Sequence, residues 1–284
     1  MKYKLFIADY DGTLGLGDEV YPETIESIRN FVNKGGIFVV CSGRETTSIM
    51  NILKKYDIKG LVVSFQGARI TDIESGKVIF EGGLNVETAF KVIDRVGERG
   101  LTLIAYGESN VFAQEHTARV ENYGKIVGLE VVYTDVKEEL LRQKENICKI
   151  CWLGDDDIVN QTADEINAIF KGEGVKLNSG AKHLLEAINP SCSKGFAVRF
   201  LADYYGVKLE EVIAVCHSCH SVIHIGRTQL LGDEEKAIAH FCRVNECSYS
   251  DYIKELGKAN EDHRRRNQIP EWGLDLKYLE RYAK

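Results

Sequence analysis

Residues 5–14 read LFIADYDGTL, an apolar run that ends in two aspartates and a glycine. The run Leu5–Ala8 predicts a buried β-strand, and the following turn is expected to open at Gly12. Because side chains alternate along a strand, Asp9 and Asp11 point the same way where the strand ends. With a divalent cation and a phosphate, two such carboxylates can act as nucleophile and acid/base partner. Alternatively, both aspartates are ordinary turn or helix-capping residues.

Helices and apolar strands alternate after this stretch. The pattern predicts a helix from Pro22 to Gly35-Gly36, a strand Ile37–Cys41, a helix from Glu45 to about Tyr56 and a strand Leu61–Val63. Unbroken apolar strands separated by helices predict an α/β fold with a parallel sheet covered on both faces. Ligands bind at the carboxyl ends of the strands in such sheets, and Asp9 and Ser42 occupy such positions.

Two short stretches are predicted to mark crossings between domains: Gly82-Gly83 and Asn189-Pro190. The pattern between them predicts an inserted α+β layer. We therefore expect a core domain formed by residues 1–82 and 189–284, and an inserted cap domain at residues 83–188. After the second crossing, a helix that begins at Lys194 and a last parallel strand, Val212–Val215, are predicted to complete the core sheet.

Two further motifs follow the opening stretch in order. Ser42-Gly43-Arg44 comes directly after the second strand, and Ser193-Lys194-Gly195 opens the helix after the insert. Together with the Asp9–Leu14 motif, they resemble the haloacid dehalogenase-like (HAD) superfamily, and within it the Cof-type phosphatases with an inserted α/β cap. The resemblance extends from Lys4 to Val215 and implies a Rossmann-like parallel-sheet core with that cap.

The resemblance also implies a role for each motif residue. Asp9 would attack phosphorus and form an aspartyl-phosphate, and Asp11 would protonate the leaving oxygen and later deprotonate the attacking water. Mg²⁺ would lie on the Asp9 carboxylate and the Asp11 backbone carbonyl. The phosphate would be held by Gly12, Thr13, Ser42, Gly43 and Lys194. From the residues alone, Ser42 could instead be a helix cap, and Lys194 a solvated lysine at a helix start.

The sequence departs from the family pattern after the last predicted core strand. The family carries an acidic motif there that supplies a third protein ligand for Mg²⁺, whereas this chain reads Cys216-His217-Ser218-Cys219-His220-Ser221. His217 and Ser221 stand where the two acidic residues belong. Three interpretations are open: a phosphatase with an altered metal site, a protein that binds phosphorylated ligands without turnover, or a sequence that differs here from the natural gene.

Two other acidic or metal-ligand clusters have simpler interpretations. Cys216, His217, Cys219, His220 and His224 allow a zinc site, but a closed site needs four convergent ligands and this short cluster offers no second half. Leu153–Asp157 resembles a strand that ends in an acidic turn. Because a helical pattern follows from Ile158, we interpret these aspartates as ordinary helix caps that suit the positive end of the helix.

Composition argues against a nucleic-acid-binding protein and against a membrane-spanning protein. The formal net charge of −7 gives no basic footprint for nucleic acid, and no apolar run approaches the roughly 20 residues of a membrane span. The N-terminus enters a strand pattern without the features of a signal peptide, so we expect a cytoplasmic protein. The eight cysteines are expected to be reduced and to have no function.

The expected function is Mg²⁺-dependent hydrolysis of a small phosphate monoester through an aspartyl-phosphate. The expected partner is a small phosphorylated metabolite, and sugar phosphates, nucleotides and cofactor phosphates all fit the sequence. Two alternatives stay open: a non-catalytic phosphate-ligand binding protein of the same fold, and a sugar phosphomutase. No motif assigns a role to residues 232–284 or an oligomeric state.

Overall fold

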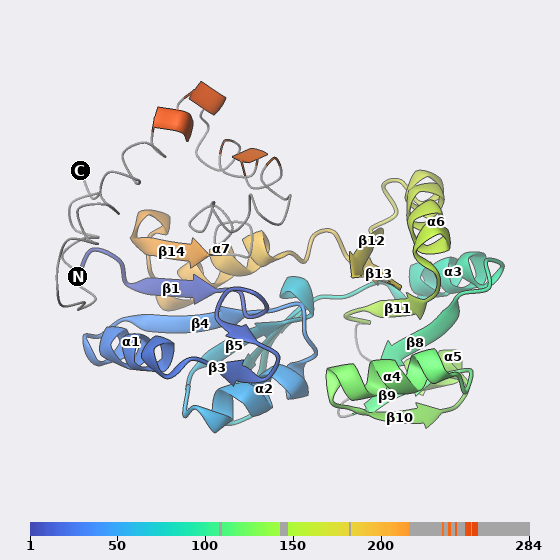
Figure 1. Cartoon of the computed structure of the whole chain (residues 1–284), viewed down its shortest axis with the longest axis horizontal. Helices are drawn as coiled ribbons and strands as arrows, with labels where there is room; N and C mark the ends of the chain where they lie inside the picture. The colour runs from blue at the N-terminus through green and yellow to red at the C-terminus, as the bar shows by residue number, and fades with distance from the viewer. Residues whose placement is uncertain are drawn as a thin grey trace. The chain divides into compact units, whose positions relative to one another are not determined.

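The structure is a computed structural model (Figure 1). It describes residues 1–107, 110–142, 147–181 and 183–215, together with residues 235, 238, 239, 242, 248–250 and 252–254. Met1–Cys216 forms one compact unit, to which everything below belongs. The altered motif at Cys216–Ser221, the zinc interpretation that adds His224, and most of residues 232–284 lie outside the described residues.

The first sheet has six strands in the order β14-β1-β4-β5-β6-β7. Their bounds are Leu5–Ala8 (β1), Ile37–Cys41 (β4), Leu61–Ser64 (β5), Arg69–Asp72 (β6), Val78–Glu81 (β7) and Val212–Val215 (β14). β14, β1, β4 and β5 run parallel, and the β6–β7 hairpin adds two antiparallel strands. β1 lies between β14 and β4, with Leu5 opposite both Val212 and Ile37. The predicted parallel core sheet is therefore confirmed.

Helices cover both faces of this sheet because its strands are apolar on both sides. The helices are α1 (Pro22–Asn33), α2 (Thr46–Lys55) and α7 (Lys194–Tyr205). Phe38 and Val40 of β4 belong to a buried cluster with side chains of α1 and α2. Val39 and Cys41 belong to a second cluster, which includes Ala197 and Leu201 of α7. Since neighbouring residues of β4 feed different clusters, the two clusters lie on opposite faces.

A second sheet, with its helices, forms the cap. The strand order is β10-β9-β8-β11-β13-β12, and only β9 and β10 pair in parallel. The strands are Thr102–Tyr106 (β8), Asn110–Ala113 (β9), Glu130–Tyr133 (β10), Ile150–Leu153 (β11), Lys176–Ala181 (β12) and Leu184–Ile188 (β13). The helices are Val86–Gly97 (α3), Ala118–Val127 (α4), Val136–Arg142 (α5) and Asp156–Ile169 (α6). All these elements come from the chain between β7 and α7.

Five short elements have no counterpart in the sequence predictions. They are the hairpin β2 (Gly15–Leu16) and β3 (Glu19–Val20), helix α5, and two 3₁₀ turns, η1 (Phe65–Gly67) and η2 (Leu209–Glu211). Strands of two residues and turns of three are too short to show a periodic pattern. Within the described residues, no helix has both the length and the apolar character that crossing a membrane requires.

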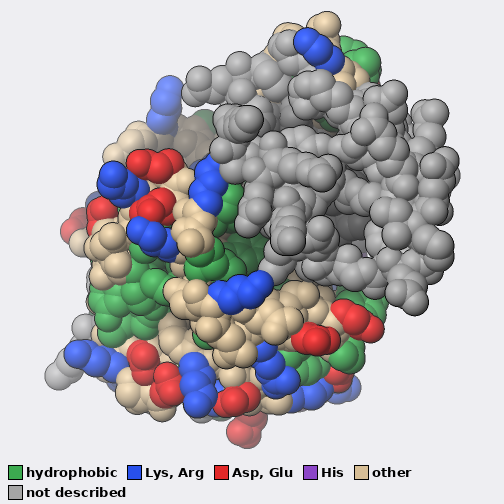
Figure 2. Space-filling view, turned by 90° about the vertical axis from the view of Figure 1, so that its left-hand side faces the viewer, with side chains coloured by type: hydrophobic (Ala, Val, Ile, Leu, Met, Phe, Trp, Pro, Cys, Tyr) green, Lys and Arg blue, Asp and Glu red, His purple; other side chains and the backbone are tan. Residues whose placement is uncertain are grey.

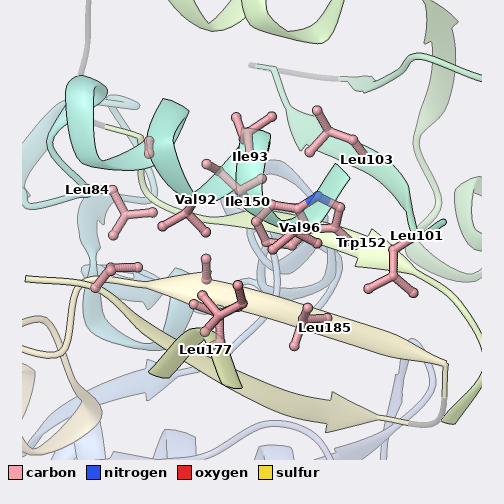
Figure 3. Close-up of a cluster of buried hydrophobic side chains, with 14 of the residues drawn as sticks. Leu84, Val92, Ile93, Val96, Leu101, Leu103, Ile150, Trp152, Leu177 and Leu185 are labelled. Atoms are coloured by element: carbon pink, nitrogen blue, oxygen red, sulfur yellow. The ribbon is translucent and has the colours of Figure 1, made fainter. Parts of the chain in front are cut away.

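The cap has its own hydrophobic core around Trp152 of β11 (Figure 3). Trp152 is 0% exposed, and it packs among side chains of α3 and of neighbouring strands. The labelled members of this cluster are Leu84, Val92, Ile93, Val96, Leu101, Leu103, Ile150, Leu177 and Leu185. The indole Nε1 has no hydrogen-bond partner within the described part of the chain. Trp152 therefore contributes through its buried apolar surface.

Replacing Trp152 should show how strongly the cap depends on this cluster. Trp152→Ala is expected to lower the free energy of unfolding by about 3–5 kcal/mol, because it leaves a large cavity. Trp152→Phe should cost clearly less, since it keeps an aromatic ring and removes the buried N–H that lacks a partner. Chemical denaturation monitored by circular dichroism measures both values. Equal losses for the two variants would contradict this account.

Candidate active site

Three sequence motifs meet at one edge of the core sheet. Asp9 follows β1, Ser42 follows β4, and Lys194 is the first residue of α7. The Lys194 ammonium lies 2.6 Å from Asp9 Oδ1, and the Tyr10 amide donates to the same oxygen at 2.8 Å. The Asp9 side chain is 11% exposed and that of Lys194 is 31% exposed. Lys194 is therefore a paired residue of this site, and its interpretation as a merely solvated lysine is wrong.

Asp11 is held by Arg44, the last residue of the Ser-Gly-Arg motif. Arg44 Nη2 lies 2.9 Å from Asp11 Oδ1, and Nε lies 3.1 Å from Oδ2, so the contact is bidentate. The same guanidinium donates to Asp18 Oδ1 at 2.9 Å and to the carbonyl of Gly17 at 2.8 Å. Arg44 thus ties the β2–β3 hairpin to the end of β1. The sequence places Arg44 in the Ser42-Gly43-Arg44 motif but predicts no role for it.

Ser42 is fully buried and orders the loop that follows it. Its Oγ accepts a hydrogen bond from the Arg44 amide at 3.1 Å. The N-cap of α2 is Glu45, whose carboxylate accepts from the Thr47 and Ser48 amides at 2.6 and 2.9 Å. The interpretation of Ser42 as a helix cap is therefore wrong. Direct contact between its hydroxyl and a phosphate would require the side chains around it to open.

The turn after Asp9 is stabilised internally. The Gly12 amide donates to the carbonyl of Gly15 at 3.1 Å, and the Thr13 amide donates to the carbonyl of Tyr10 at 3.2 Å. Gly12 adopts a φ of +69°, which favours glycine. The buried Thr13 Oγ1 has no hydrogen-bond partner among the described residues. The amides of Gly12 and Thr13, predicted to bind phosphate, are thus used within the turn, and the Thr13 hydroxyl is buried there.

The turn η1 locks the motifs together, and the sequence did not reveal it. The Phe65 amide donates to the Arg44 carbonyl at 2.9 Å, and the Gln66 amide donates to the Ser42 carbonyl at 3.1 Å. A Cβ on Gly43 would collide with the Gln66 side chain, and one on Gly67 with the Ser193 carbonyl. Phe65 and Gln66 have positive φ angles of +49° and +60°. Such a conformation costs energy in non-glycine residues and persists where the surroundings enforce it.

Comparison with known proteins identifies the family. The sequence model of the haloacid dehalogenase-like hydrolases matches residues 6–215. The chain belongs to this family. This region contains the Asp9, Ser42 and Lys194 motifs and ends with β14.

Two relatives of this haloacid dehalogenase-like protein are named as phosphatases. A putative phosphatase of Haemophilus influenzae is 28% identical over 253 residues, which cover 86% of this chain and 92% of the relative. Because 86% of this chain is more than its first 215 residues, the matched region extends past Val215. An HMP-PP phosphatase of an Enterobacter species is 21% identical over 212 residues, which cover 74% of this chain and 76% of the relative.

The fold is shared with solved structures of the family. The crystal structure of a haloacid dehalogenase-like hydrolase from Bacteroides thetaiotaomicron superposes with a TM-score of 0.67 at 21% sequence identity. The superposition covers 75% of this chain and 80% of that one. The α/β core with its additional cap strands and helices is therefore the fold of the family.

The oxygen donors at the end of β1 fit a hard cation. Mg²⁺ prefers oxygen ligands, keeps several waters, and is commonly held by one or two carboxylates together with substrate phosphate. The Asp9 carboxylate and the Asp11 carbonyl are donors of this kind. Within the described residues, no group of three His, Cys, Asp or Glu side chains could hold a metal ion. The Asp9 carboxylate and the Asp11 carbonyl, which follow β1, are therefore chemically suitable donors for Mg²⁺.

Cys41 lies at the end of β4, close enough to the Asp9–Lys194 pair to feel its charges. Burial raises the pKa of the Cys41 thiol to about 12, although the nearby Lys194 ammonium acts in the opposite direction. A thiol with this pKa is protonated at neutral pH and is a poor nucleophile. This buried, protonated thiol is therefore no candidate nucleophile for the site.

Removing the Arg44 guanidinium should release the β2–β3 hairpin. In Arg44→Ala, amide hydrogen exchange across Gly15–Val20 is expected to accelerate at least about tenfold, because the hairpin loses its ties at Gly17 and Asp18. Mass-spectrometric hydrogen exchange measures this rate, with Arg95→Ala on α3, whose ion partner is Glu98 at the end of the same helix, as the control. Unchanged exchange in the hairpin would show that Arg44 does not hold it.

Proposed function

We propose that this chain is a phosphatase that hydrolyses a small phosphate monoester through an aspartyl-phosphate on Asp9. The supporting observation is the 2.6 Å contact between the Lys194 ammonium and Asp9 Oδ1. A carboxylate and a phosphate dianion repel each other, so attack of one on the other requires a cation between them. Lys194 supplies this cation, and its place at the start of α7 keeps the ammonium beside the end of β1.

The reaction proceeds in two displacements. Asp9 attacks phosphorus, the bond from phosphorus to the leaving oxygen breaks, and Asp11 donates a proton to that oxygen. Water then attacks phosphorus, Asp11 takes its proton, and phosphate leaves as the Asp9 carboxylate is restored. Lys194 pairs with a phosphoryl oxygen in both steps. Mg²⁺, held by the Asp9 carboxylate and the Asp11 carbonyl, would neutralise further phosphate charge.

Arg44 has to release Asp11 for this chemistry. The Asp11 carboxylate oxygens accept from the Arg44 guanidinium, so they must leave this partner before they can exchange a proton with the substrate. Both groups are accessible, since the Asp11 side chain is 54% exposed and that of Arg44 is 21% exposed. A phosphorylated substrate offers Arg44 an alternative anionic partner, so substrate entry would free Asp11 for proton transfer.

Several observations support a small phosphorylated metabolite as the substrate. Relatives of this chain bear the names putative phosphatase and HMP-PP phosphatase. The described part of the face shown in Figure 2 mixes acidic and basic side chains, which favours no polyanionic partner there. We further propose a cytoplasmic location. The described cysteines, four of them buried, are free thiols, and this fits a reducing compartment. Specificity would come from the cap, which can contact the leaving group.

Hydrolysis of p-nitrophenyl phosphate tests this function. Asp9→Asn is expected to lower kcat at least about 10³-fold, because the amide cannot form the acyl phosphate. The matched control is Asp57→Asn, the same chemical change at an exposed residue beyond α2, and it should retain activity. Chelation by EDTA should abolish turnover, and added Mg²⁺ should restore it.

Two outcomes would assign a different function. Absence of Asp9-dependent turnover with any divalent metal would contradict the enzyme and support a phosphate-ligand binding protein. Transfer of the phosphoryl group to an added sugar, in place of phosphate release, would support a phosphomutase. Quantifying free phosphate beside p-nitrophenol separates these outcomes.

A further inference from the structure

A lysine of the cap reaches the phosphate-binding loop of the core. Lys149 directly precedes β11 and is 5% exposed. Its ammonium donates to Glu186 Oε1 at 2.8 Å and to the backbone carbonyl of Gly43 at 3.2 Å. Glu186 lies on β13, opposite Cys151 of β11. The ion pair is therefore internal to the cap sheet, and its remaining contact crosses to the loop between Ser42 and Arg44.

The surroundings of Lys149 exclude water and concentrate its charge. The ammonium lies 5.1 Å from the ring centroid of Tyr106 and 5.9 Å from that of Phe65, both cation–π distances. These two rings contact each other edge to face, with centroids 5.4 Å apart, and the Tyr106 hydroxyl bonds to that of Tyr123. Burial is the largest effect and opposes the charge on Lys149, but several opposing effects, led by the Glu186 carboxylate, together raise the pKa of the lysine. Lys149 is therefore a cation at neutral pH.

Fold stability alone does not explain a charge in this position. Removing two ions from water costs about as much as their attraction returns, and apolar residues of similar volume often serve as well. The Gly43 contact gives the ammonium a second use. Gly43 O and Arg44 N belong to the same peptide group, which is planar. The Lys149 ammonium donates to the carbonyl oxygen of this peptide group, and the amide nitrogen of the same group donates to Ser42 Oγ at 3.1 Å.

The orientation of this one peptide affects both ends of the loop. If the plane rotates, the Arg44 amide loses Ser42 Oγ, and the Arg44 side chain that binds Asp11 moves with its backbone. The end of the Gln66 side chain also packs against Gly43, where a Cβ would displace it. A single ammonium from the cap thus holds the peptide between the predicted phosphate clamp and the partner of the predicted acid/base group.

We propose that Lys149 is a positioning residue through which the cap orders the Ser42–Arg44 loop for phosphate binding. The phosphate-binding role of that loop rests on the function proposed above. Lys149 does not touch the reacting atoms, so its effect reaches them through the Gly43–Arg44 peptide. Glu186 keeps the ammonium in place and charged.

The test separates positioning from stability by removing the whole ion pair. Lys149→Met alone leaves an unpaired buried carboxylate and should unfold at a lower temperature than the wild type. In Lys149→Met/Glu186→Leu no buried charge remains, so the unfolding temperature should return close to that of the wild type. If Lys149 positions the loop, the double variant should nevertheless bind inorganic phosphate about tenfold more weakly and show a similar loss of kcat/KM.

The matched control is a second ion pair of the cap, between Arg99 and Glu165, which is partly exposed and joins the segment after α3 to α6. Arg99→Met/Glu165→Leu should leave phosphate affinity and kcat/KM within about twofold of the wild type. Phosphate affinity is measured by calorimetry on the full chain, and it does not require turnover. If the wild type binds phosphate without hydrolysing it, the proposed function fails while the Lys149 comparison remains decisive.

Two results would overturn the proposal. One is a double variant with wild-type stability, wild-type phosphate affinity and wild-type kcat/KM, because Lys149 would then be an ordinary structural partner of Glu186. The other is a wild-type chain that neither binds nor hydrolyses phosphate, which would also overturn the proposed function.

Discussion

The ion pair between Asp9 and Lys194 is the interaction on which the rest of the site depends. It joins the end of the first strand to the start of the last described helix, and the whole cap lies between them in the sequence. The pair forms because β1 lies inside a parallel sheet and α7 packs its Ala197–Leu201 face against that sheet. A carboxylate that is 11% exposed needs such a partner, and a phosphate that enters the site can share it.

Around this pair, backbone geometry is fixed by a few demanding contacts. Phe65 and Gln66 adopt left-handed conformations, and Gly67 passes so close to Ser193 that a side chain there would collide. This turn bonds to the carbonyls of Ser42 and Arg44. The strain is located where three chain segments converge, as expected for a site in which loop positions must be exact to within a fraction of an ångström. The cap adds Lys149 to the same loop, through the carbonyl of Gly43.

The core elements could be predicted from the sequence because their signals are local. The predicted bounds of β1 and α7 agree with the structure: Leu5–Ala8 is an apolar run, and Ser193 caps a helix that Gly206 ends. The acidic turn precedes a helix as predicted, but α6 already begins at Asp156, and the Asp155 side chain at the N-cap position makes no capping hydrogen bond. Glu45, rather than Ser42, caps α2. The sequence could not distinguish the two, because both residues precede the helix and only the structure shows which side chain accepts from the helix amides.

Features that depend on distant residues could not be read from the pattern. Arg44 binds Asp11 and Asp18 only because β4 lies beside β1, and Lys149 meets Gly43 only because the cap folds back to the core loop. The hairpin β2–β3 has two residues in each strand, which is too few for a periodicity. Pairing of charges across the fold has no sequence signature, since lysines and glutamates are common on any solvated surface.

The most direct measurement is to locate the phosphoryl group on the protein. Asp11→Asn should slow hydrolysis of the intermediate, so acid-quenched samples incubated with p-nitrophenyl phosphate and Mg²⁺ should gain one phosphoryl group by intact mass. Peptide mapping is predicted to place that group on Asp9, and the gain should be absent from Asp9→Asn/Asp11→Asn. A phosphoryl group on any other residue, or wild-type hydrolysis without phosphorylation of Asp9 in this variant, would contradict Asp9 as the nucleophile.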